Sequence, residues 1–338
     1  MQNFDYVTPT RLIFGKGVVE QLPEVMHQYG KRILLTYGGG SIKKIGLYDK
    51  VKTLLSDFEI VELSGIQPNP KYDPSVLDGV KLCKEHDVDV ILSVGGGSVL
   101  DCSKAIAAGA KYDGDPLLYP AVSFLDPTYT FTVSRKQTAV GCADAMNHIM
   151  EQYFCEDSTL LNDGFMEAAL KSLMVNAKKC LENPKDYTAR AEMMLDCTYG
   201  CNGIYSLGNS ESGWPCHGME HALSAYYDIT HGEGLAIITP RWMKHILSDK
   251  TVSRFVKYGV NVFGIDPDLD RFDIANRAIE ETYQFFASIG IPMHLKEVGI
   301  DESRIDEMAH HVAENEGLEN AWAPLQEKDI ADIFRASL

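Results

Sequence analysis

The stretch DVDVILSVGGGSVLD, residues 87–101, joins a buried-strand pattern to a helix start through three glycines. Valine, isoleucine and leucine dominate the residues before the turn, as expected for a strand inside a parallel sheet. Gly95, Gly96 and Gly97 carry no side chains, so their backbone N–H groups can approach a diphosphate at the positive end of the following helix. The pattern predicts a phosphate-binding turn, although a tight turn without a ligand has the same sequence.

Strand and helix patterns alternate on either side of this stretch through the first third of the chain. Strand-like runs and helix-like stretches follow one another: RLIFG (11–15), GVVEQLPEVMHQYG (17–30), RILLTYG (32–38), FEIVEL (58–63) and DPSVLDGVKLCKEHD (73–87). A second glycine turn, TYGGGSIKK (36–44), also ends a strand. The alternation predicts parallel strands joined by right-handed crossovers, and two glycine turns in one sheet favour a nucleotide site over two turns without a ligand.

The rest of the chain is predicted to be helical. Apolar residues recur at spacings of three and four from about Val140 onward, as in ADAMNHIMEQYF (143–154) and RFDIANRAIEETYQFFASIG (271–290). A chain of 338 residues exceeds the size at which single cores stop growing. We therefore expect two domains, an α/β domain over residues 1–130 and an all-α domain over residues 131–338.

Composition excludes several classes of protein. The formal net charge of -17 disfavours nucleic acid and anionic membranes as partners. Apolar runs stay well short of the roughly 20 residues of a membrane span, and the N-terminus lacks a signal-peptide pattern. These features predict a soluble cytoplasmic protein. Its eight cysteines form no C-x-x-C pair and are expected to be thiols buried as small apolar side chains.

Asp144 and His148 lie four residues apart in a predicted helix, and His217 and His221 repeat this spacing. Side chains at such positions share one helix face and can bind one cation, although a single pair of this kind is more often an exposed contact. His217 and His231 are each followed by glycine, which we expect to leave room for a ligand or cofactor. One aspartate with several histidines suits Fe²⁺ or Zn²⁺ better than Ca²⁺ or Mg²⁺.

The sequence resembles the iron-containing (group III) alcohol dehydrogenases, most closely their NADPH-dependent butanol dehydrogenase and aldehyde reductase branch. The shared motifs run along nearly the whole chain: LIFGKG, YGGGSIKK, QPNP, VGGGSVLDCSKAIA, LDPTYTF, QTAVGCADAMNHIMEQYF and HGMEHALSAYYDITHGEGLAI. The resemblance implies an N-terminal Rossmann-like domain, a helical C-terminal domain and an active site in the cleft between them. It also implies a small aldehyde or alcohol as substrate and a homodimer.

The resemblance assigns roles to individual residues. The metal ligands would be Asp144, His148, His217 and His231, and His221 would lie near the nicotinamide as a candidate in proton relay. The residues implied for cofactor binding are Gly38, Gly39, Ser41, Asn69, Gly95, Gly96, Gly97, Ser98 and Asp101. A glycerol-dehydrogenase-like or dehydroquinate-synthase-like enzyme on the same fold, and a nucleotide-binding protein without catalysis, are the alternatives.

The residues that follow the predicted strand, in the turn at 36–44, indicate which nicotinamide cofactor is preferred. Enzymes selective for NAD usually end this strand with an acidic residue, which bonds the ribose 2′-hydroxyl and repels a 2′-phosphate. Here glycines, Ser41 and two lysines follow Thr36 instead, and they offer N–H groups, a hydroxyl and cations to a phosphate. We therefore expect NADP(H) to be preferred over NAD(H), and Gly38→Asp to reverse or flatten that preference.

One segment implied by the resemblance is absent from the sequence. After AIAAGAKYDGDP the family continues for several dozen residues through a strand and a Thr-Gly-Ser-rich turn, but here Leu117 follows Pro116 directly. Losing a strand would expose backbone polar groups and apolar neighbours in the sheet. We hypothesise that the sequence omits this stretch. A Pro116–Leu117 C–N distance far above the ~1.33 Å of a peptide bond would support that hypothesis.

Overall fold

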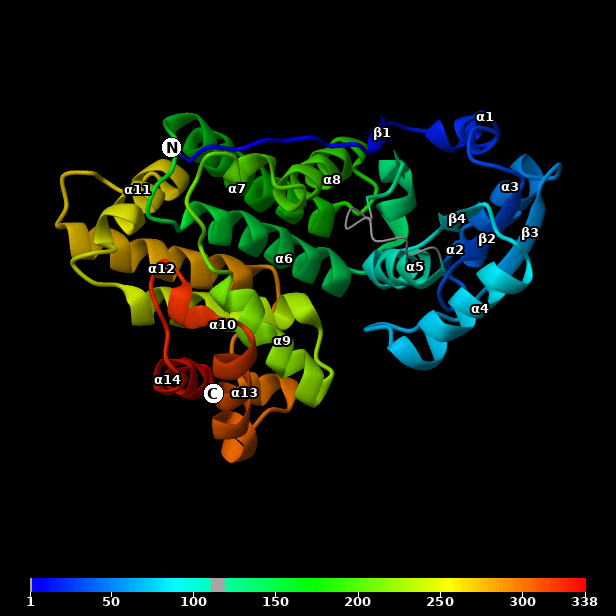
Figure 1. The fold of residues 1–338 in the computed structure, drawn as a ribbon. Helices are drawn as coiled ribbons and strands as arrows, with labels where there is room; N and C mark the ends of the chain where they lie inside the picture. Colours follow the sequence, from blue (N-terminus) through cyan, green and yellow to red (C-terminus); the bar gives the residue numbers. More distant parts are fainter. Residues whose placement is uncertain (1, 111–118) are drawn as a thin grey trace. The chain divides into compact units, whose positions relative to one another are not determined.

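The computed structural model describes residues 2–110 and 119–338, and Figure 1 shows the course of the chain. The chain forms two compact units. One unit comprises Thr8–Thr132, and the other comprises Val133–Leu338 together with the residues up to Val7. The α/β unit ends at Thr132, two residues after the predicted end at 130, and the first residues belong to the helical unit and not to the α/β unit.

The first four strands of the α/β unit lie within the strand-like runs of the sequence. β2 (Arg32–Thr36) is the middle strand between β3 (Glu59–Leu63) and β4 (Val90–Ser93), and both pairings are parallel (Figure 1). β1 (Arg11–Phe14) pairs in parallel with β5 (Val122–Leu125) in a separate two-stranded sheet. The expected parallel architecture is therefore confirmed within the described residues.

Helices cover both faces of the three-stranded sheet. Ile33 and Leu35 of β2 belong to one apolar cluster, which contains residues of α1 and α3, whereas Leu34 belongs to another, which contains residues of α4 and α5. Successive residues of a strand point to opposite faces, and helices cover both faces of this sheet. All three side chains are therefore fully buried. The helices of this unit are α1 (Leu22–Met26), α2 (Ser41–Lys44), α3 (Leu47–Leu54), α4 (Leu77–Glu85) and α5 (Gly97–Ala110).

The second unit is helical, as predicted. Side-chain oxygens of Ser134, Thr159, Asp186 and Asp270 cap the N-termini of four of its helices. Its helices are α6 (Arg135–Tyr153), α7 (Leu160–Glu182), α8 (Tyr187–Cys201), α9 (Pro215–Tyr227), α10 (His231–Ile246), α11 (Val252–Phe263), α12 (Arg271–Ser288), α13 (Ile305–Asn315) and α14 (Glu327–Ala336).

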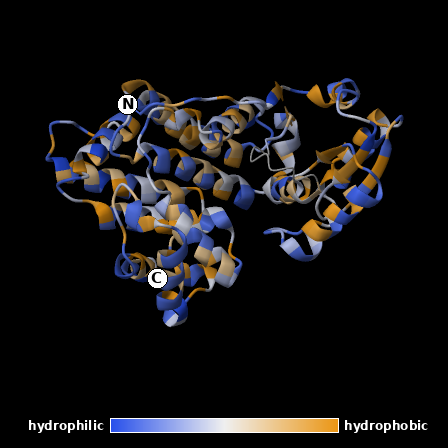
Figure 2. Ribbon diagram, viewed as in Figure 1, coloured by the Kyte–Doolittle hydropathy of each residue, from blue (hydrophilic) through white to orange (hydrophobic). Residues whose placement is uncertain are grey.

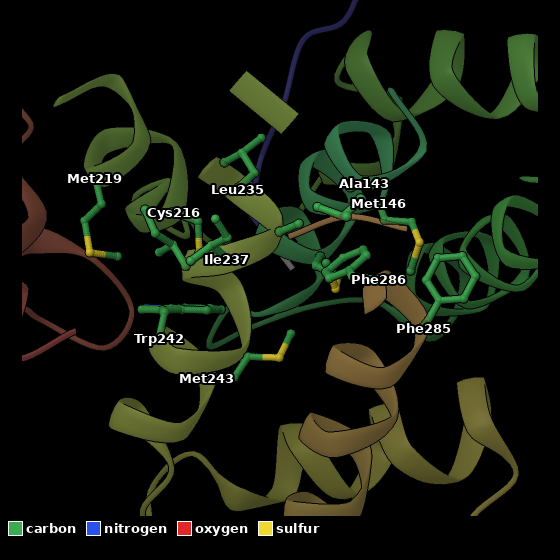
Figure 3. Packing of buried hydrophobic residues seen from close by; sticks show 14 of the residues in the cluster. Ala143, Met146, Cys216, Met219, Leu235, Ile237, Trp242, Met243, Phe285 and Phe286 are labelled. Carbon is green, nitrogen blue, oxygen red and sulfur yellow. The ribbon is translucent and has the colours of Figure 1, made fainter. Parts of the chain in front are cut away.

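α6 is the central helix of this unit and packs against α7, α8 and α10. Figure 2 shows hydrophobic and hydrophilic residues alternating along the helices around it. In Figure 3, side chains of α10, among them Trp242 and Met243, lie in one apolar cluster with Met146 of α6 and Phe286 of α12. Polar side chains buried in α6 therefore sit in a closely packed environment, which restricts where they can point.

Three sequence predictions concern single features of the chain. The eight cysteines all lie in the described residues and form no disulfide, but Cys201 is exposed and Cys197 is only partly buried, so burial is not common to all eight. None of the described helices is long and apolar enough to cross a membrane. The hypothesis of an omitted stretch concerns Pro116 and Leu117, which lie outside the described residues.

Candidate active site

Three helices bring the predicted metal ligands together. Asp144 and His148 lie one turn apart on α6, and His217 lies in the first turn of α9. His231 is the first residue of α10. A short turn that contains Asp228 in a left-handed conformation joins α9 to α10. The two helices pack against each other, and α10 also packs on α6.

Asp144 is the centre of this group. One ligand atom each from Asp144, His217 and His231 lies within 4.8 Å of the other two. Nε2 of His217 and Nε2 of His231 are each 3.9 Å from Asp144 Oδ1. That separation is too long for a hydrogen bond, but it is near the ~3.4 Å between two ligands of a tetrahedral ion with bonds of about 2.1 Å.

His148 contacts Asp144 but does not join the group of three. Its Nδ1 lies 3.0 Å from the carbonyl oxygen of Asp144, with which it hydrogen-bonds, and 3.0 Å from Asp144 Oδ1. Its ring stands edge-on to that of His217, with ring centroids 4.4 Å apart. The structure therefore places all four predicted ligands side by side and aligns three of them around a common point.

Two buried glutamates complete the group, and the sequence analysis missed both. Glu151 of α6 is hydrogen-bonded to Nδ1 of His217, and Glu220 of α9 is hydrogen-bonded to Nδ1 of His231. Neither carboxylate side chain is exposed. Their partners could not be read from the sequence, because Glu151 and His217 are 66 positions apart and lie on different helices, as do Glu220 and His231.

The glycines after the two histidines have a different role from the one expected. A Cβ at Gly232 would lie 2.2 Å from the carbonyl oxygen of Val140, and a Cβ at Gly218 would lie 3.1 Å from Cβ of Glu316. Both glycines are buried. They allow close helix packing and do not leave room for a ligand, so that expectation was wrong.

His221 and Trp214 flank the group. His221 is more than half exposed, and its ring centroid lies 6.0 Å from that of His231. Its Nδ1 is 3.4 Å from Oε1 of Glu316. The Trp214 ring stands edge-on to His148 and His217, with centroid distances of 5.7 and 5.4 Å. The group is thus neighboured by an exposed imidazole and by an aromatic ring.

Opposite charges shift the pKa values inside the group. Burial alone would raise the pKa of Asp144, but the hydrogen bond and positive charge of His148 outweigh it and lower this pKa. Burial would lower the pKa of His148 and of His231, yet contacts with Asp144 and Glu220 respectively raise both values. The group therefore holds a concentration of negative charge that favours a cation.

The buried atoms fit a divalent metal. Nε2 of His217 is buried and has no hydrogen-bond partner, although buried polar atoms are normally paired. It points at the same carboxylate oxygen as Nε2 of His231. Imidazole nitrogens with one carboxylate oxygen are ligands typical of Zn²⁺ or Fe²⁺.

The two predicted phosphate turns of the α/β unit are neighbours. β2 ends at Thr36 and β4 ends at Ser93, and these two residues are directly paired. The hydroxyls of Thr36 and Ser93 both bond to Ser103 of α5. The chain leaves β2 for β3 on one side and returns to β4 on the other, so both turns border a topological switch point, where nucleotides bind in such sheets.

The glycines of these turns divide into two kinds. A Cβ at Gly95 would lie 2.6 Å from Val99, and a Cβ at Gly38 would lie 3.3 Å from the Ile66 carbonyl oxygen. Gly39, Gly96 and Gly97 have no atoms within 4 Å of an added Cβ. Packing therefore accounts for the first pair, whereas the other three leave backbone accessible to a ligand.

The remaining predicted cofactor residues lie on or near the same edge. Ser41 is the first residue of α2, and Ser98 lies in the first turn of α5. Asp101 is exposed and pairs with Lys104 at 3.5 Å. Asn69 is an exposed loop residue with a positive φ of 47°. No feature of these four residues, beyond their position, links them to a cofactor.

Family comparisons cover almost the whole chain. Residues 9–136 match the family described as iron-containing alcohol dehydrogenase, and residues 138–338 match the C-terminal part of the Fe-containing alcohol dehydrogenase family. The chain belongs to the iron-containing alcohol dehydrogenase family. It is therefore an oxidoreductase, and the resemblance inferred from its motifs is confirmed.

Individual relatives agree with this assignment. The chain is 41% identical to NADH-dependent butanol dehydrogenase A of Clostridium acetobutylicum, with both sequences covered completely. It is 32% identical to the NADPH-dependent aldehyde reductase YqhD of Escherichia coli over 93% of this chain and 94% of the relative. The crystal structure of NADH-dependent butanol dehydrogenase A from Thermotoga maritima superposes with a TM-score of 0.93 at 32% identity, covering 100% and 99% of the two chains.

The alignment length bears on the absent segment. The comparison with the Clostridium enzyme spans 390 residues, whereas this iron-containing alcohol dehydrogenase has 338. The relative therefore contains residues that have no counterpart in this sequence. That difference is expected if a family segment is missing from this sequence.

Proposed function

We propose that this chain interconverts small aliphatic aldehydes and primary alcohols such as butanol, using a bound metal and a nicotinamide cofactor. The observation that supports the proposal most strongly is the convergence of His217 Nε2 and His231 Nε2 on Asp144 Oδ1, with the His148 ring beside them. The names of the Clostridium and Escherichia relatives support the substrate class and the cofactor class.

Asp144, His148, His217 and His231 would hold one Fe²⁺ or Zn²⁺. The ion, when bound, would supply a Lewis acid for the aldehyde oxygen. Asp144 and the two glutamates place three carboxylates around three histidines. A divalent cation would offset most of that charge, which is costly to bury unpaired.

The turns after β2 and β4 would bind the nicotinamide cofactor. The open backbone at Gly39, Gly96 and Gly97 would accept its phosphates, with Gly38, Ser41, Gly95, Ser98, Asn69 and Asp101 around them. The reduced nicotinamide would supply hydride to the carbonyl carbon. Residues 1–130 and 131–338, as predicted from the sequence, would thus divide cofactor and metal between them.

His221 is the proposed proton donor in aldehyde reduction. Its ring lies beside that of His231, it is exposed, and Glu316 is close enough to Nδ1 to hold its ring. We expect His221→Ala to keep the metal and to slow turnover, because the proton would have to come from water.

The preference for NADP(H) over NAD(H) is tested at the turn after β2. Support comes from the absence of an acidic residue between Thr36 and Lys44. The sequence suggested Gly38→Asp as the test, but a Cβ at Gly38 would lie only 3.3 Å from the Ile66 carbonyl oxygen. Gly39→Asp has open space and is the cleaner test. We expect it to lower the ratio of kcat/KM for NADPH to that for NADH, while Gly39→Asn tests bulk without charge.

A cytoplasmic homodimer is the proposed state of the protein. Exposed apolar side chains at the start of α7, Leu160, Leu161 and Phe165, support an additional contact surface. Light scattering of the purified chain and cell fractionation test the two parts separately. An intact mass of 37.5 kDa for the natural protein would show that the family segment after Pro116 is truly absent.

A single assay tests the activity. Protein loaded anaerobically with Fe²⁺, or with Zn²⁺, is mixed with butyraldehyde and either NADPH or NADH, and nicotinamide absorbance is followed. The proposal expects aldehyde-dependent loss of absorbance that a chelator abolishes. Undiminished turnover in metal-free protein would contradict the metal-dependent mechanism.

A further inference from the structure

Glu151 and Glu220 are the most deeply buried acidic residues next to the candidate ligands. Each has a fully buried carboxylate, and each is hydrogen-bonded to Nδ1 of one histidine, His217 or His231. Burying a carboxylate is costly unless it is paired and hydrogen-bonded. These two carboxylates therefore sit where they do because of the imidazoles that they contact.

A second hydrogen bond fixes the orientation of each glutamate. Oε1 of Glu151 accepts a hydrogen bond from the backbone N–H of Cys216 at 2.6 Å. This N–H lies in the first turn of α9, where backbone donors have no partner within the helix. Oε1 of Glu220 accepts the hydroxyl of Ser224 at 2.6 Å. With one oxygen held in this way, the other oxygen has a fixed position opposite the histidine.

Glu220 packs directly against a glycine of α10. A Cβ at Gly234 would lie 2.7 Å from Cγ of Glu220 and 2.8 Å from its Oε1. Gly234 is buried in the first turn of α10, the turn that begins with His231. The sequence HGEG thus supplies both the histidine and the space for the carboxylate that contacts it.

These contacts define which nitrogen of each imidazole is free. A carboxylate only accepts hydrogen bonds, so Nδ1 of His217 and of His231 carries the proton. Nε2 of each ring then presents its lone pair, and both Nε2 atoms point toward Asp144 Oδ1 at 3.9 Å. The tautomer set by each glutamate is the one that a metal at this point requires.

His148 provides an internal contrast. Its Nδ1 is bonded to the carbonyl oxygen of Asp144, and no buried glutamate contacts it among the described residues. It is also the predicted ligand that lies outside the group of three aligned atoms. The two histidines with a dedicated carboxylate are aligned, and the one without it is not.

We infer that Glu151 and Glu220 are positioning residues that lock His217 and His231 in the Nδ1–H tautomer and thereby preorganise the metal site. This inference rests on the proposed metal-dependent function. Besides His231, Glu220 bonds to the hydroxyl of Ser224 on its own helix, whereas Glu151 of α6 also holds the N-terminus of α9 through Cys216. Glu220 variants therefore give the cleaner test.

The test compares the wild type with Glu220→Ala, Glu220→Gln and Glu167→Gln. Glu167 is a matched control, because it is buried in the same unit and bonded to Tyr153 and Asn261 but contacts no candidate ligand. The Zn²⁺ dissociation constant is measured by competition with a chromophoric chelator. In metal-free protein at about pH 8.5, ¹⁵N spectra of labelled histidines report the tautomer of each ring.

We expect Glu220→Ala to weaken Zn²⁺ binding about 10–100-fold and to remove the fixed Nδ1–H tautomer of His231. Glu220→Gln, which keeps an oxygen acceptor, should lose less affinity, and Glu167→Gln should bind Zn²⁺ as the wild type does. Wild-type affinity in Glu220→Ala, or an Nε2–H tautomer of His231 in the wild type, would overturn the inference. A wild-type protein that binds no metal but shows both Nδ1–H tautomers would overturn the proposed function alone.

Discussion

The two units build their candidate sites in different ways. In the helical unit, buried side chains meet one another, and residues such as Glu151, Asp163, Glu167, Glu220 and Glu233 are charged and almost fully buried. In the described part of the α/β unit, Asp126 is the only buried charged residue. Its candidate nucleotide edge consists of exposed glycine turns at the ends of β2 and β4.

This difference predicts how each site responds to substitution. A side-chain site depends on particular atoms at particular distances, so one replacement removes a ligand or leaves a buried charge unpaired. A backbone site tolerates most changes but not an added Cβ in a crowded position. Effects should therefore be large in the helical unit, and in the α/β unit they should depend on which glycine is replaced.

The largest effect is expected from His217→Ala or His231→Ala. Each variant removes one nitrogen facing Asp144 Oδ1 and leaves an incomplete ligand set. We expect loss of most bound metal and a fall in kcat/KM of about 10³-fold or more, since a Lewis acid contributes several kcal/mol. His86→Ala, an exposed histidine of the α/β unit, is the control. Near-normal kcat/KM in either ligand variant would show that the side-chain site is not the catalytic one.

The next largest effect concerns a buried carboxylate with two cationic partners. Burial alone would raise the pKa of Asp163, but hydrogen bonds from Arg254 and Lys257 outweigh it and lower the pKa to about 2. We expect Asp163→Asn to lower the free energy of unfolding by about 3 kcal/mol at pH 7.

The pH dependence of this loss has a definite sign. Because the folded pKa of Asp163 lies below the unfolded value, its contribution is complete above about pH 4 and is lost as pH falls toward 2. Urea unfolding at pH 7, 4 and 3 measures the difference in free energy of unfolding between the wild type and Asp163→Asn. A difference in free energy of unfolding that stays constant over this pH range would mean that ionised Asp163 does not stabilise the helical unit.

A smaller effect separates packing from binding at the glycine turn after β4. An added Cβ at Gly95 would overlap Val99, whereas one at Gly96 meets no atom within 4 Å. We expect Gly95→Ala to destabilise the protein by about 2 kcal/mol and Gly96→Ala to leave its stability unchanged. Gly96→Ala should instead raise KM for the nicotinamide cofactor. Thermal unfolding and steady-state kinetics of the pair measure both quantities, and equal effects of the two substitutions would refute the distinction.

The smallest effect is a gain in stability. Burial raises the pKa of Asp196 in α8 to about 6, and its Oδ2 is buried without a hydrogen-bond partner. The folded protein therefore disfavours the ionised carboxylate, and the penalty grows as pH rises from about 4 to 6. Asp196→Asn should stabilise the protein by about 1 kcal/mol at pH 7 and have no effect below pH 4. Destabilisation at pH 7 would show that the hydrogen bond of Ser172 to ionised Asp196 outweighs the cost of burying the charge.

Local sequence patterns predicted much of this arrangement. Residues 32–38, 58–63 and 87–97 predicted the strands and their parallel pairing, because buried strands and glycine turns are local signals. Helical spacing indicated Asp144 with His148 and His217 with His221, and the family resemblance added His231 as a predicted ligand.

Contacts between distant residues were not predictable in this way. The pairing of Glu151 with His217 joins residues 66 positions apart, and the closure of α10 on α6 that requires Gly232 depends on the packed core. Neither leaves a periodic signal in the sequence. The same holds for residues up to Val7, whose place in the helical unit follows from tertiary contacts alone.

The central claim is that Asp144 Oδ1 and the surrounding imidazoles form one metal site. The most direct measurement is a Zn²⁺ titration of metal-free wild type and Asp144→Asn, with a chromophoric chelator as competitor. The account predicts one tightly bound ion per chain in the wild type and a loss of affinity of at least about 10-fold in Asp144→Asn, since the carboxylate is the common neighbour of the three histidines. Equal affinity and stoichiometry in the two proteins would contradict it.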